Sequence, residues 1–503
     1  MKVILIALAI VGAAFMTNAG AQSPTITVGM WADAVSLDPH RTNDLPSARV
    51  MRQLYETLIV QSESLELEPG LATSWEQLDD VTWEFRIRED VEFHNSEALR
   101  ASDVVFSLNR LADPSVAAPA AFLISFIAHV EALDEHTVRI TTEYPFAPML
   151  AHLAHPATAI LNERAVTHAG DDYGTAVVVG TGPFTFERWD VQTQIVLSRN
   201  DAWWGGEIAP ARLAFRPIPD GLMRAIELET GGVDIAYQLE PQDVRRLENN
   251  ANVQLAAVET LTTHYLGFNT QKEPFHDVRV RQAINHAVDV DLIIEAVFAG
   301  QAVRATSPTS PRVFGANTEL EPYQHSVERA RELLAEAGYE GGFSTTLWTP
   351  NNPVYMQVTE IVQAQLADIG VNVAIHVLEW GSYIAETAAG HHDMLILGWG
   401  TATGDADYGL YAPFHSSRFG AQGNRTFYAN ERVDQLLERG QRTANVQERL
   451  AAYLEAQQII RDEAPWLFLV VPIEVTGLAA DLSGFEPHPA GNHRLHTVTR
   501  SPR

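Results

Sequence analysis

The amino-acid sequence predicts an α/β protein built of two lobes with a cleft between them. Strand patterns alternate with helix patterns along the chain instead of forming separate blocks, and this alternation is typical of sheets with some parallel pairing. The rhythm runs through two stretches, the second beginning near Phe343. About 480 residues follow an N-terminal leader, too many for one hydrophobic core. We therefore expect two lobes, each with its own sheet and core, joined by crossing strands that form a hinge.

The N-terminus has the pattern of a secretory signal peptide. Lys2 supplies a positive start, residues 3–16 are almost wholly apolar, and Ala19-Gly20-Ala21 fits the small-x-small cleavage rule. The apolar run is too short to remain as a membrane anchor. No cysteine occurs in the chain, so it offers no disulfide, thiolate metal site or lipid-accepting cysteine. We expect residues 1–21 to be removed and the mature protein to act in the periplasm without a lipid anchor.

Composition limits the classes of partner. Hydrophobic residues make up 46% of the chain, which is enough to bury a sizeable core. The formal net charge is -30 at pH 7, and a surface of this sign repels nucleic acid and anionic membranes. We expect neither as a partner.

Lobe 1 is predicted to begin with a strand over Thr25–Met30 that leads into Trp31. A helix over Ser47–Leu58 follows, with Ser47 as its expected cap. The alternating run Val81–Ile87 predicts a half-buried strand, and Ser102 is the expected cap of the next helix. Further strands are predicted over His136–Thr142, Phe184–Trp189, Ile195–Leu197 and Leu213–Ile218, and a helix over Gly221–Leu228.

Lobe 2 is predicted to follow the strand Thr263–Asn269. Asp277 should cap the first of two helices, and Gly300 should end the second. The apolar strand from Trp466 contains Pro472 and follows Pro465, which should restrict it to a sheet edge or to separate pieces. The other predicted elements are the helices Ser326–Ala337, Tyr355–Ile369, Ser382–Ala389, Glu431–Leu437 and Val446–Glu463, and the strands Thr345–Thr349, Val371–Glu379 and Met394–Trp399.

Residues 394–413 form the leading candidate for a ligand site. The apolar run Met394–Leu397 predicts a buried strand, which passes into a turn rich in Gly, Thr and Asp. Trp399 offers a flat apolar wall, the glycines around it allow close approach of a ligand to the backbone, and Asp405 can take an amine. The alternative is a surface turn with a core tryptophan, in which Asp405 caps the segment that follows.

The first strand has a similar layout, since it also delivers a tryptophan and then a polar turn. We expect the two segments to form two walls of one cleft. The candidate ligand-binding residues are Trp31, Asp33 and Ser36 in the first segment, and Gly398, Trp399, Gly400, Thr401, Ala402, Thr403 and Asp405 in the second.

Residues 72–109 carry the most specific pattern in the chain. It consists of Ala72, Trp75, Thr82, Trp83, Phe85, Ile87, Arg88, Ala101, Asp103, Val104 and Ser107. This pattern resembles the signature of the dipeptide and oligopeptide class (family 5) of extracellular solute-binding proteins that serve ABC importers, and the resemblance covers the whole mature chain. The usual Asp-Gly turns of that class are Asp80-Val81 and His94-Asn95-Ser96 here, which affects turn geometry more than binding. The strings AHPATAI, VGTGPF, EAGYEGGFSTTLW and GWGTATGDADYGL look most like the glutathione-binding branch.

The resemblance implies a class II, cluster C periplasmic-binding-protein fold with an extra domain. Domain I would comprise residues 22–58, 180–269 and 473–503, domain II residues 59–179, and domain III residues 270–472. The hinges would lie near Asn269 and Pro472, and the ligand would be enclosed between domains I and III. A monomer that delivers its ligand to a cognate ABC permease is implied as well.

Two departures from the class concern the ligand. Peptide binders place an aspartate three residues after the tryptophan, where this chain has Ala402, and dipeptide binders supply an arginine where this chain reads residues 349–353, TPNNP. An ordinary dipeptide would lose the partners of both its ends. Glutathione, with its γ-glutamyl link, fits that loss, and so does a non-peptide solute such as a nickel complex, a sugar or an opine-like compound.

A secreted hydrolase is the main alternative from another class. The sequence has no G-x-S-x-G elbow, no H-E-x-x-H motif and no glycine-rich phosphate loop ending in lysine. Acidic residues are abundant, but no pair stands out as glycosidase acids. Sequence repeats and all-β patterning, which would favour a structural or adhesive role, are missing too. We therefore expect a binding protein without catalysis and without a cofactor.

Histidines raise the possibility of a metal, because members of this class carry nickel. The His391 pair lies in an expected loop, where solvated histidines are ordinary, and we expect no functional metal site. The candidate ligands are His152, His155, His391, His392, Asp393, His488, His493 and His496.

Overall fold

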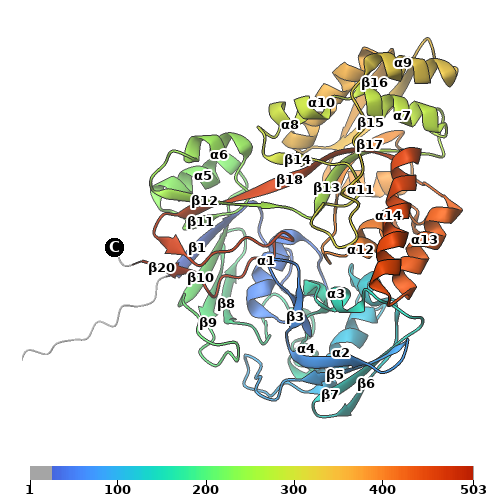
Figure 1. Ribbon diagram of the computed structural model, residues 1–503. Helices are drawn as coiled ribbons and strands as arrows, with labels where there is room; N and C mark the ends of the chain where they lie inside the picture. The colour runs from blue at the N-terminus through green and yellow to red at the C-terminus, as the bar shows by residue number, and fades with distance from the viewer. Residues whose placement is uncertain (1–24, 502–503) are drawn as a thin grey trace, which may run out of the picture.

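A computed structural model describes residues 25–501, so the predicted signal peptide, residues 1–21, lies outside the described part of the chain. Figure 1 shows two lobes of strands and helices, with the long strand β18 (Trp466–Ala479) running from one into the other. A third part has its own antiparallel sheet. We call residues 262–471 lobe 2, residues 59–160 the accessory domain, and the remaining described residues lobe 1.

Lobe 1 is built around β1 (Thr25–Met30), in which the alternating side chains of Ile26, Val28 and Met30 are buried. β1 is parallel to both of its neighbours, and two antiparallel strands extend the sheet beyond β10. The other elements of lobe 1 are β8 (Phe184–Asp190), β9 (Gln194–Arg199), β10 (Arg212–Pro217), β11 (Ile235–Ala236), β12 (Val253–Glu259), β19 (Leu482–Ser483) and β20 (Thr499–Arg500), with α1 (Leu45–Leu54), α4 (Glu163–Ala169), α5 (Gly221–Thr230) and α6 (Pro241–Leu247).

The two predicted caps in the first part of the chain are wrong. α1 begins at Leu45, and the Asp44 carboxylate caps it by accepting the Ser47 N–H at 2.9 Å. Pro46 favours this earlier start, because proline has a preset φ and lacks an N–H that the first turn would leave unpaired. α2 (Ala101–Ala112) begins before Ser102, and the Asp103 carboxylate accepts the Arg100 N–H at 3.0 Å.

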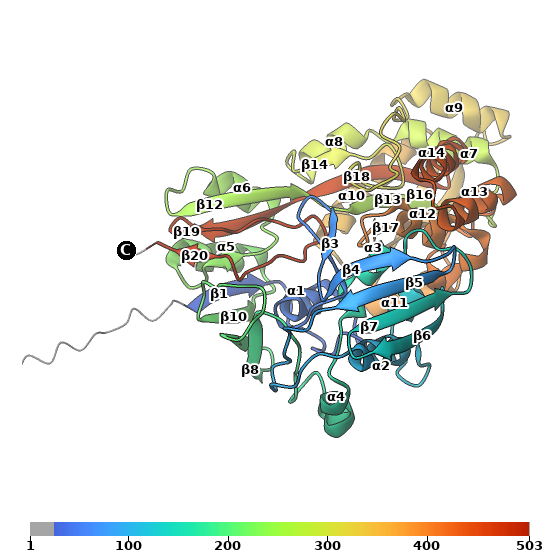
Figure 2. The same cartoon turned by 60° about the horizontal axis from the view of Figure 1, so that its bottom comes forward.

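The accessory domain contains a four-stranded antiparallel sheet in the order β4-β5-β7-β6, which Figure 2 brings to the front. α2 packs against β6 and β7. Side chains after residue 160, including Val166 and Tyr173, pack into the core of lobe 1 instead. The elements of this domain are β2 (Ile59–Gln61), β3 (Leu67–Pro69), β4 (Ala72–Gln77), β5 (Thr82–Ile87), β6 (Ile127–Asp134), β7 (Thr137–Thr142), α2 and α3 (Met149–Leu153).

Lobe 2 has parallel strands at one side and antiparallel strands at the other. β15 lies parallel between β16 and β17, and β13 lies antiparallel between β17 and β18. Asp277 caps its helix as predicted, Ser326 is the cap of a helix that was predicted to begin with it, and α14 has the predicted bounds. The elements are β13 (Thr262–Phe268), β14 (Ala302–Arg304), β15 (Phe343–Pro350), β16 (Val371–Leu378) and β17 (Met394–Gly400), with α7 (Val278–Ala287), α8 (Val290–Ala296), α9 (Val327–Glu336), α10 (Pro353–Ala367), α11 (Trp380–Ala388), α12 (Ala406–Phe414), α13 (Glu431–Arg442) and α14 (Val446–Glu463).

The two lobes share one continuous sheet, which corrects the expectation of separate sheets. Strand β18 is unbroken, pairing with β13 through residues 466–470 and with β12 through residues 473–479. Pro472 lies between the β13 and β12 pairings and opposite Ala302 of β14, and the neighbouring Ile473 N–H donates to the Gln301 carbonyl at 3.1 Å. The Pro472 carbonyl accepts the Thr260 N–H at 3.0 Å. The predicted boundary at Asn269 is also displaced, because β13 pairs with β17 and the chain enters lobe 2 near Thr262.

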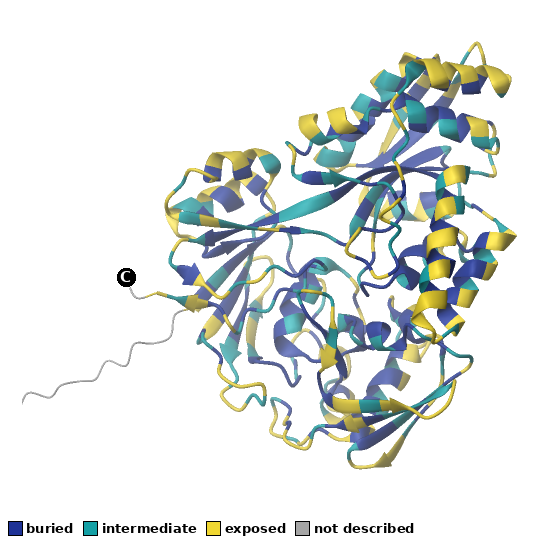
Figure 3. Ribbon diagram, in the orientation of Figure 1, coloured by how far each residue is buried: buried dark blue, intermediate teal, exposed yellow. Residues whose placement is uncertain are grey.

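Each part of the molecule has its own buried apolar core, although one sheet runs through both lobes. Figure 3 shows the buried residues inside each part and the exposed ones along its outer helices. Distinct apolar clusters fill lobe 1 and the accessory domain, and two more cover opposite faces of the lobe 2 sheet, with Leu266 in one and Tyr265 in the other. Within residues 25–501 no helix is both long enough and apolar enough to cross a membrane.

Candidate ligand-binding cleft

Strand β17 carries the predicted ligand segment out of the core of lobe 2. Its first four residues, Met394–Leu397, are buried, and the strand becomes progressively exposed from Gly398 to Gly400. A Cβ atom on Gly398 would lie 2.9 Å from the Tyr355 hydroxyl and from the His264 ring. Glycine is therefore required here for packing within the protein, and the exposed end of β17 is what a ligand can reach.

Cavity A lies on one side of this strand end, between lobe 2 and the accessory domain, and has a volume of about 520 Å³. An aromatic wall forms its centre. Tyr408 stacks on Trp399 and on Phe122, each with a ring-centroid distance of 5.8 Å, and the Trp399 indole donates to the Tyr408 carbonyl at 3.2 Å. The other main lining residues are Ser125, Phe126, Tyr144, Phe146, His152, Asp407, Tyr411, Arg418, Gln422, Arg425 and Gln441.

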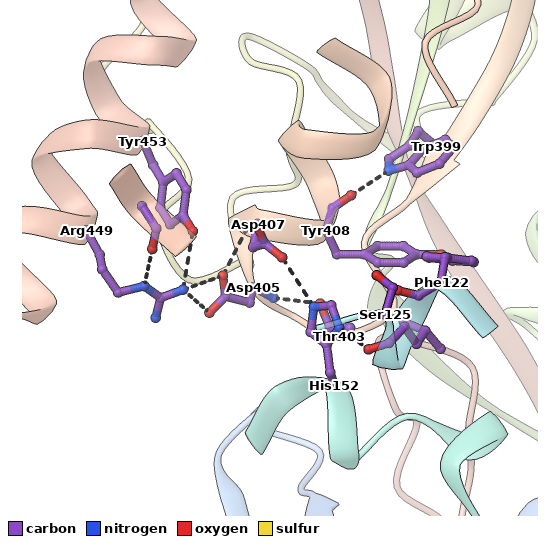
Figure 4. Close-up of polar contacts among 12 residues, drawn as sticks. Phe122, Ser125, His152, Trp399, Thr403, Asp405, Asp407, Tyr408, Arg449 and Tyr453 are labelled. Carbon is purple, nitrogen blue, oxygen red and sulfur yellow. Dashed lines mark hydrogen bonds and ion pairs between the residues drawn. The ribbon is translucent and has the colours of Figure 1, made fainter. Parts of the chain in front are cut away.

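An acid and a histidine from different parts of the molecule meet in cavity A. Asp407 Oδ2 lies 3.3 Å from His152 Nε2, and both side chains are buried (Figure 4). The other ring nitrogen, His152 Nδ1, is 2.8 Å from the Leu123 carbonyl. Asp407 Oδ1 is buried and has no hydrogen-bond partner among the described residues. Asp407 therefore keeps one carboxylate oxygen without a partner among residues 25–501 at the wall of cavity A.

Arg418 and Arg425 add positive charge to cavity A, and the sequence analysis missed both. They lie close together in the segment after α12 and are partly exposed. Their only sequence signal is the presence of two arginines within eight positions near the candidate segment, which is too common to identify a site.

Cavity B lies on the other side of the strand end, toward the crossing strands, and has a volume of about 440 Å³. Gly400, Thr401 and Ala402 line it together with Asn352 and Tyr355 of lobe 2. Lobe 1 contributes Leu45, Gln238, Glu240, Val244, Glu474, Val475, Pro489, Ala490 and Gly491. The Thr401 hydroxyl is buried without a hydrogen-bond partner among the described residues. Cavity B is therefore lined by residues of both lobes.

Two titratable groups of cavity B have strongly lowered pKa values. Burial lowers the pKa of His264 to about 4, so its ring is neutral at pH 7. Burial works to raise the pKa of Glu474, but Arg49 and His493 lower it to about 2. Glu474 Oε1 lies 2.5 Å from Arg49 and 3.3 Å from His493 Nε2. Its charge is thus already compensated inside lobe 1.

Cavities A and B lie on neighbouring stretches of the same two elements. Trp399 lines cavity A and the next residue, Gly400, lines cavity B. On the side of lobe 1, Asn43 lines cavity A and Leu45 lines cavity B. The end of β17 and the start of α1 therefore stand between the two spaces, and an extended ligand that touches this strand end has both within reach.

Asp405 has a structural role, which corrects its assignment as a ligand residue. Both carboxylate oxygens lie 2.9 Å from Arg449 Nη2, and Oδ1 also accepts the Asp407 N–H at 3.0 Å, so Asp405 caps α12 (Figure 4). Burial raises the pKa of Asp405, and Arg449 opposes that rise. Thr403 is used internally as well, since its carbonyl accepts a hydrogen bond from Gln61 Nε2 at 2.9 Å. The capping role that the sequence left open for Asp405 is the one observed.

The three candidates after β1 line neither cavity A nor cavity B. Trp31 is 46% exposed. The Asp33 carboxylate accepts hydrogen bonds from Trp189 and Gln192, and the Ser36 hydroxyl accepts the Asp38 N–H. The strand order places β13, β18 and β11 between β17 and β1, so the structure does not bring the two predicted walls face to face.

The histidines singled out in the sequence are scattered. Among residues 25–501, no group of three or more His, Cys, Asp or Glu side chains has the spacing needed to hold a metal ion. His391 pairs with Glu386, and His493 pairs with Glu474.

Comparison with known proteins gives a consistent result along the chain. Residues 66–421 match the model of the bacterial extracellular solute-binding proteins, family 5 Middle. The chain is similar to the glutathione-binding protein GsiB of Escherichia coli (strain K12), with 33% identity over 491 residues, which cover 96% of this chain and 95% of that protein.

Solved structures show the same fold. The periplasmic binding protein DppA from Helicobacter pylori, in complex with the peptide STSA, matches with a TM-score of 0.84 and 31% identity, covering 95% of this chain and 98% of that one. A dipeptide-binding protein from Pseudoalteromonas sp. SM9913, in complex with Met-Leu, matches with a TM-score of 0.84 and 25% identity, covering 95% and 100%. The predicted mixed α/β fold is confirmed.

Proposed function

Because the chain belongs to family 5 of the bacterial extracellular solute-binding proteins, we propose that it captures glutathione in the periplasm and delivers it to the permease of an ABC importer. It is the substrate-binding protein of a peptide importer, and it binds its solute without catalysis. Hinge closure of the two lobes around the cleft would enclose the solute, and the closed form would dock on the permease as a monomer.

One observation supports the choice of glutathione as the solute. Cavity B is lined by Ala402, where the class resemblance leads us to expect an aspartate, and by Asn352, which belongs to the stretch 349–353 where it leads us to expect an arginine. The two ends of an α-linked dipeptide would therefore meet a methyl group and an amide in the same interlobe space. A solute whose amine and carboxylates are spaced differently avoids this mismatch, and the γ-glutamyl link of glutathione provides such a spacing.

The size and lining of the cleft agree with this proposal. The volumes of cavities A and B are in the range of small-molecule sites, and their walls combine aromatic residues with polar and charged ones. A non-peptide solute is the second candidate, because the same two substitutions would suit it equally.

Thermal unfolding of the mature protein in the presence of matched peptides tests the proposal. Glutathione is compared with α-Glu-Cys-Gly, which has the same composition and differs only in the linkage. A solute that binds only the folded state stabilises it by about 2.7 kcal/mol at a hundredfold excess over its dissociation constant. We expect a clear rise of the midpoint with glutathione and little change with the α-linked peptide.

The variant Ala402→Asp provides the matched control on the protein side. It restores the carboxylate at the position that the class resemblance assigns to the α-amine, so it should gain affinity for α-linked dipeptides. A wild-type protein that responds to the α-linked peptides and not to glutathione would contradict the choice of solute. A response to neither would direct the search to non-peptide solutes.

A further inference from the structure

Two guanidinium groups in cavity A lack the acidic partners that arginines usually have. Arg418 donates from Nη1 to Gln422 Oε1 at 3.2 Å and lies over the Tyr411 ring at 5.2 Å. Arg425 donates from Nη1 to the Gly420 carbonyl at 3.2 Å. Neither has a carboxylate within ion-pair distance among residues 25–501. Since a guanidinium carries five N–H donors, most of the donors of both arginines remain available.

The charge of the whole protein makes this arrangement informative. The chain contains 64 acidic and 34 basic residues, so carboxylates are plentiful, and most arginines of the described chain have one nearby. Arg442, which lies over the Tyr144 ring, is 3.4 Å from Glu438. Two arginines that face a cavity and have no such partner are therefore poised to bind an anion from outside.

The loop that carries the two arginines is held rigidly. The buried Asn424 donates from its side chain to the His415 and Tyr428 carbonyls at 3.2 and 2.8 Å, and its N–H donates to the Arg418 carbonyl at 2.8 Å. Gly423 has φ +131, and a Cβ atom there would lie 2.7 Å from the Ala412 carbonyl oxygen. A loop fixed in this way presents its guanidinium groups in a set geometry, which reduces the entropy lost on binding.

Cavity A also offers an acceptor for the opposite charge. Asp407, whose Oδ1 is buried without a hydrogen-bond partner among residues 25–501, lines it together with the two arginines. An amine that reaches this carboxylate and a carboxylate that reaches the guanidinium groups would both form charge-assisted hydrogen bonds, which are roughly twice as strong as neutral ones.

We propose that Arg418 and Arg425 form a carboxylate receptor in cavity A and that the solute is a zwitterion whose amine is held by Asp407. This inference rests on the proposed function and narrows the class of solute to molecules with a free carboxylate and a free amine. It also places positive charge in cavity A, in place of the arginine that dipeptide binders have where this chain reads residues 349–353. The receptor lies in cavity A, which the accessory domain lines as well, so the carboxylate would point toward that domain.

Calorimetric titration of glutathione and of its diethyl ester into the same protein tests the receptor. The ester keeps the amine and the thiol but has no carboxylate. The variants are Arg418→Gln, Arg425→Gln and the conservative Arg418→Lys, with Arg442→Gln as a matched arginine control outside cavity A. A thermal unfolding scan of each variant checks that it is folded.

The wild-type protein should bind glutathione at least tenfold more tightly than the ester. Loss of a hydrogen bond to a charged group corresponds to about a tenfold to hundredfold loss of affinity. Arg418→Gln and Arg425→Gln should each show this loss for glutathione and little change for the ester. Arg418→Lys should fall between the wild-type protein and Arg418→Gln, because it keeps the charge but not the planar fork. Arg442→Gln should bind glutathione like the wild-type protein.

The outcomes separate this inference from the proposed function. Equal binding of acid and ester, or equal losses for both in the arginine variants, overturns the receptor while leaving glutathione as the solute. Non-peptide dicarboxylates and amino acids with acidic side chains are titrated in parallel. If only these bind, and the arginine variants weaken them, the glutathione proposal fails and the receptor stands. If no carboxylate-bearing solute binds the wild-type protein, both are overturned.

Discussion

Replacement of Asp405 by asparagine should destabilise the protein without weakening its binding of solute. The side chains of Asp405 and Arg449 are only 9% and 8% exposed, and both carboxylate oxygens contact the guanidinium. Asparagine is as good a helix cap as aspartate, so the start of α12 is preserved and only the charge is lost. Removal of one partner from a buried ion pair costs about 3–5 kcal/mol, because the other charge stays buried and unpaired.

Two further variants divide this cost into its parts. Asp405→Ala removes the cap as well and should add about 1 kcal/mol. Glu455→Gln breaks the pair between Arg432 and Glu455, whose side chains are 53% and 46% exposed, and should cost less than about 1 kcal/mol. Urea unfolding followed by tryptophan fluorescence measures all three. An Asp405→Asn protein of normal stability that has lost solute affinity tenfold would refute this reasoning and return Asp405 to the ligand site.

Three other predictions follow from the site and its surroundings. Trp399→Ala should lower solute affinity about tenfold or more in calorimetry with a modest loss of stability, because it removes the ring that stacks on Tyr408; unchanged affinity would place the solute elsewhere. Gly423→Ala should lower the unfolding midpoint, because the φ of this residue and the Ala412 carbonyl both oppose a side chain. It should also weaken the binding of carboxylates more than the binding of their esters. A variant with wild-type stability would contradict this account of the loop. The free energy of unfolding should be highest above pH 6.5 and fall as the pH drops toward 4, because burial lowers the pKa of several histidines and only the unfolded chain takes up their protons. Each such histidine should lower this free energy by about 1.4 kcal/mol per pH unit. A thermal unfolding midpoint that is flat from pH 7 to 5 would be inconsistent with buried neutral histidines. The histidines with a pKa of about 3 or 4 are His40, His94, His155, His264, His392, His488 and His496.

Local patterns predicted most of the fold. The helix Val446–Glu463 and the strand Thr25–Met30 have the predicted bounds, and Asp277 caps α7 as predicted. These features depend on residues close in sequence. The continuous strand through Pro472 was missed, because proline usually marks the end or the edge of a strand and only the change of partner at that residue makes it harmless.

The site was predictable only in part. The end of β17, with Trp399 and Gly400, was identified from its own composition. The role of Asp405 depends on Arg449, which is 44 positions away in the chain, so its neighbours in sequence could not reveal it. Arg418 and Arg425 become informative only because, within residues 25–501, no carboxylate lies at ion-pair distance from them, and a sequence does not display such an absence. Trp31 was chosen by analogy between two strands that the sheet holds three strands apart.

The hydrogen bond between Thr260 and Pro472 has a consequence for how a permease would distinguish the solute-bound protein from the free protein. The chain passes between the lobes twice, near Thr260 and at Pro472, and this bond holds the two passages side by side. If the lobes close around the cleft as proposed, we expect these two linked passages to act as one hinge axis and to favour a single rotation. A permease that distinguishes the solute-bound protein from the free protein then needs to recognise only one angle between the lobes. Solutes of different shape would be recognised alike once the lobes reach that angle.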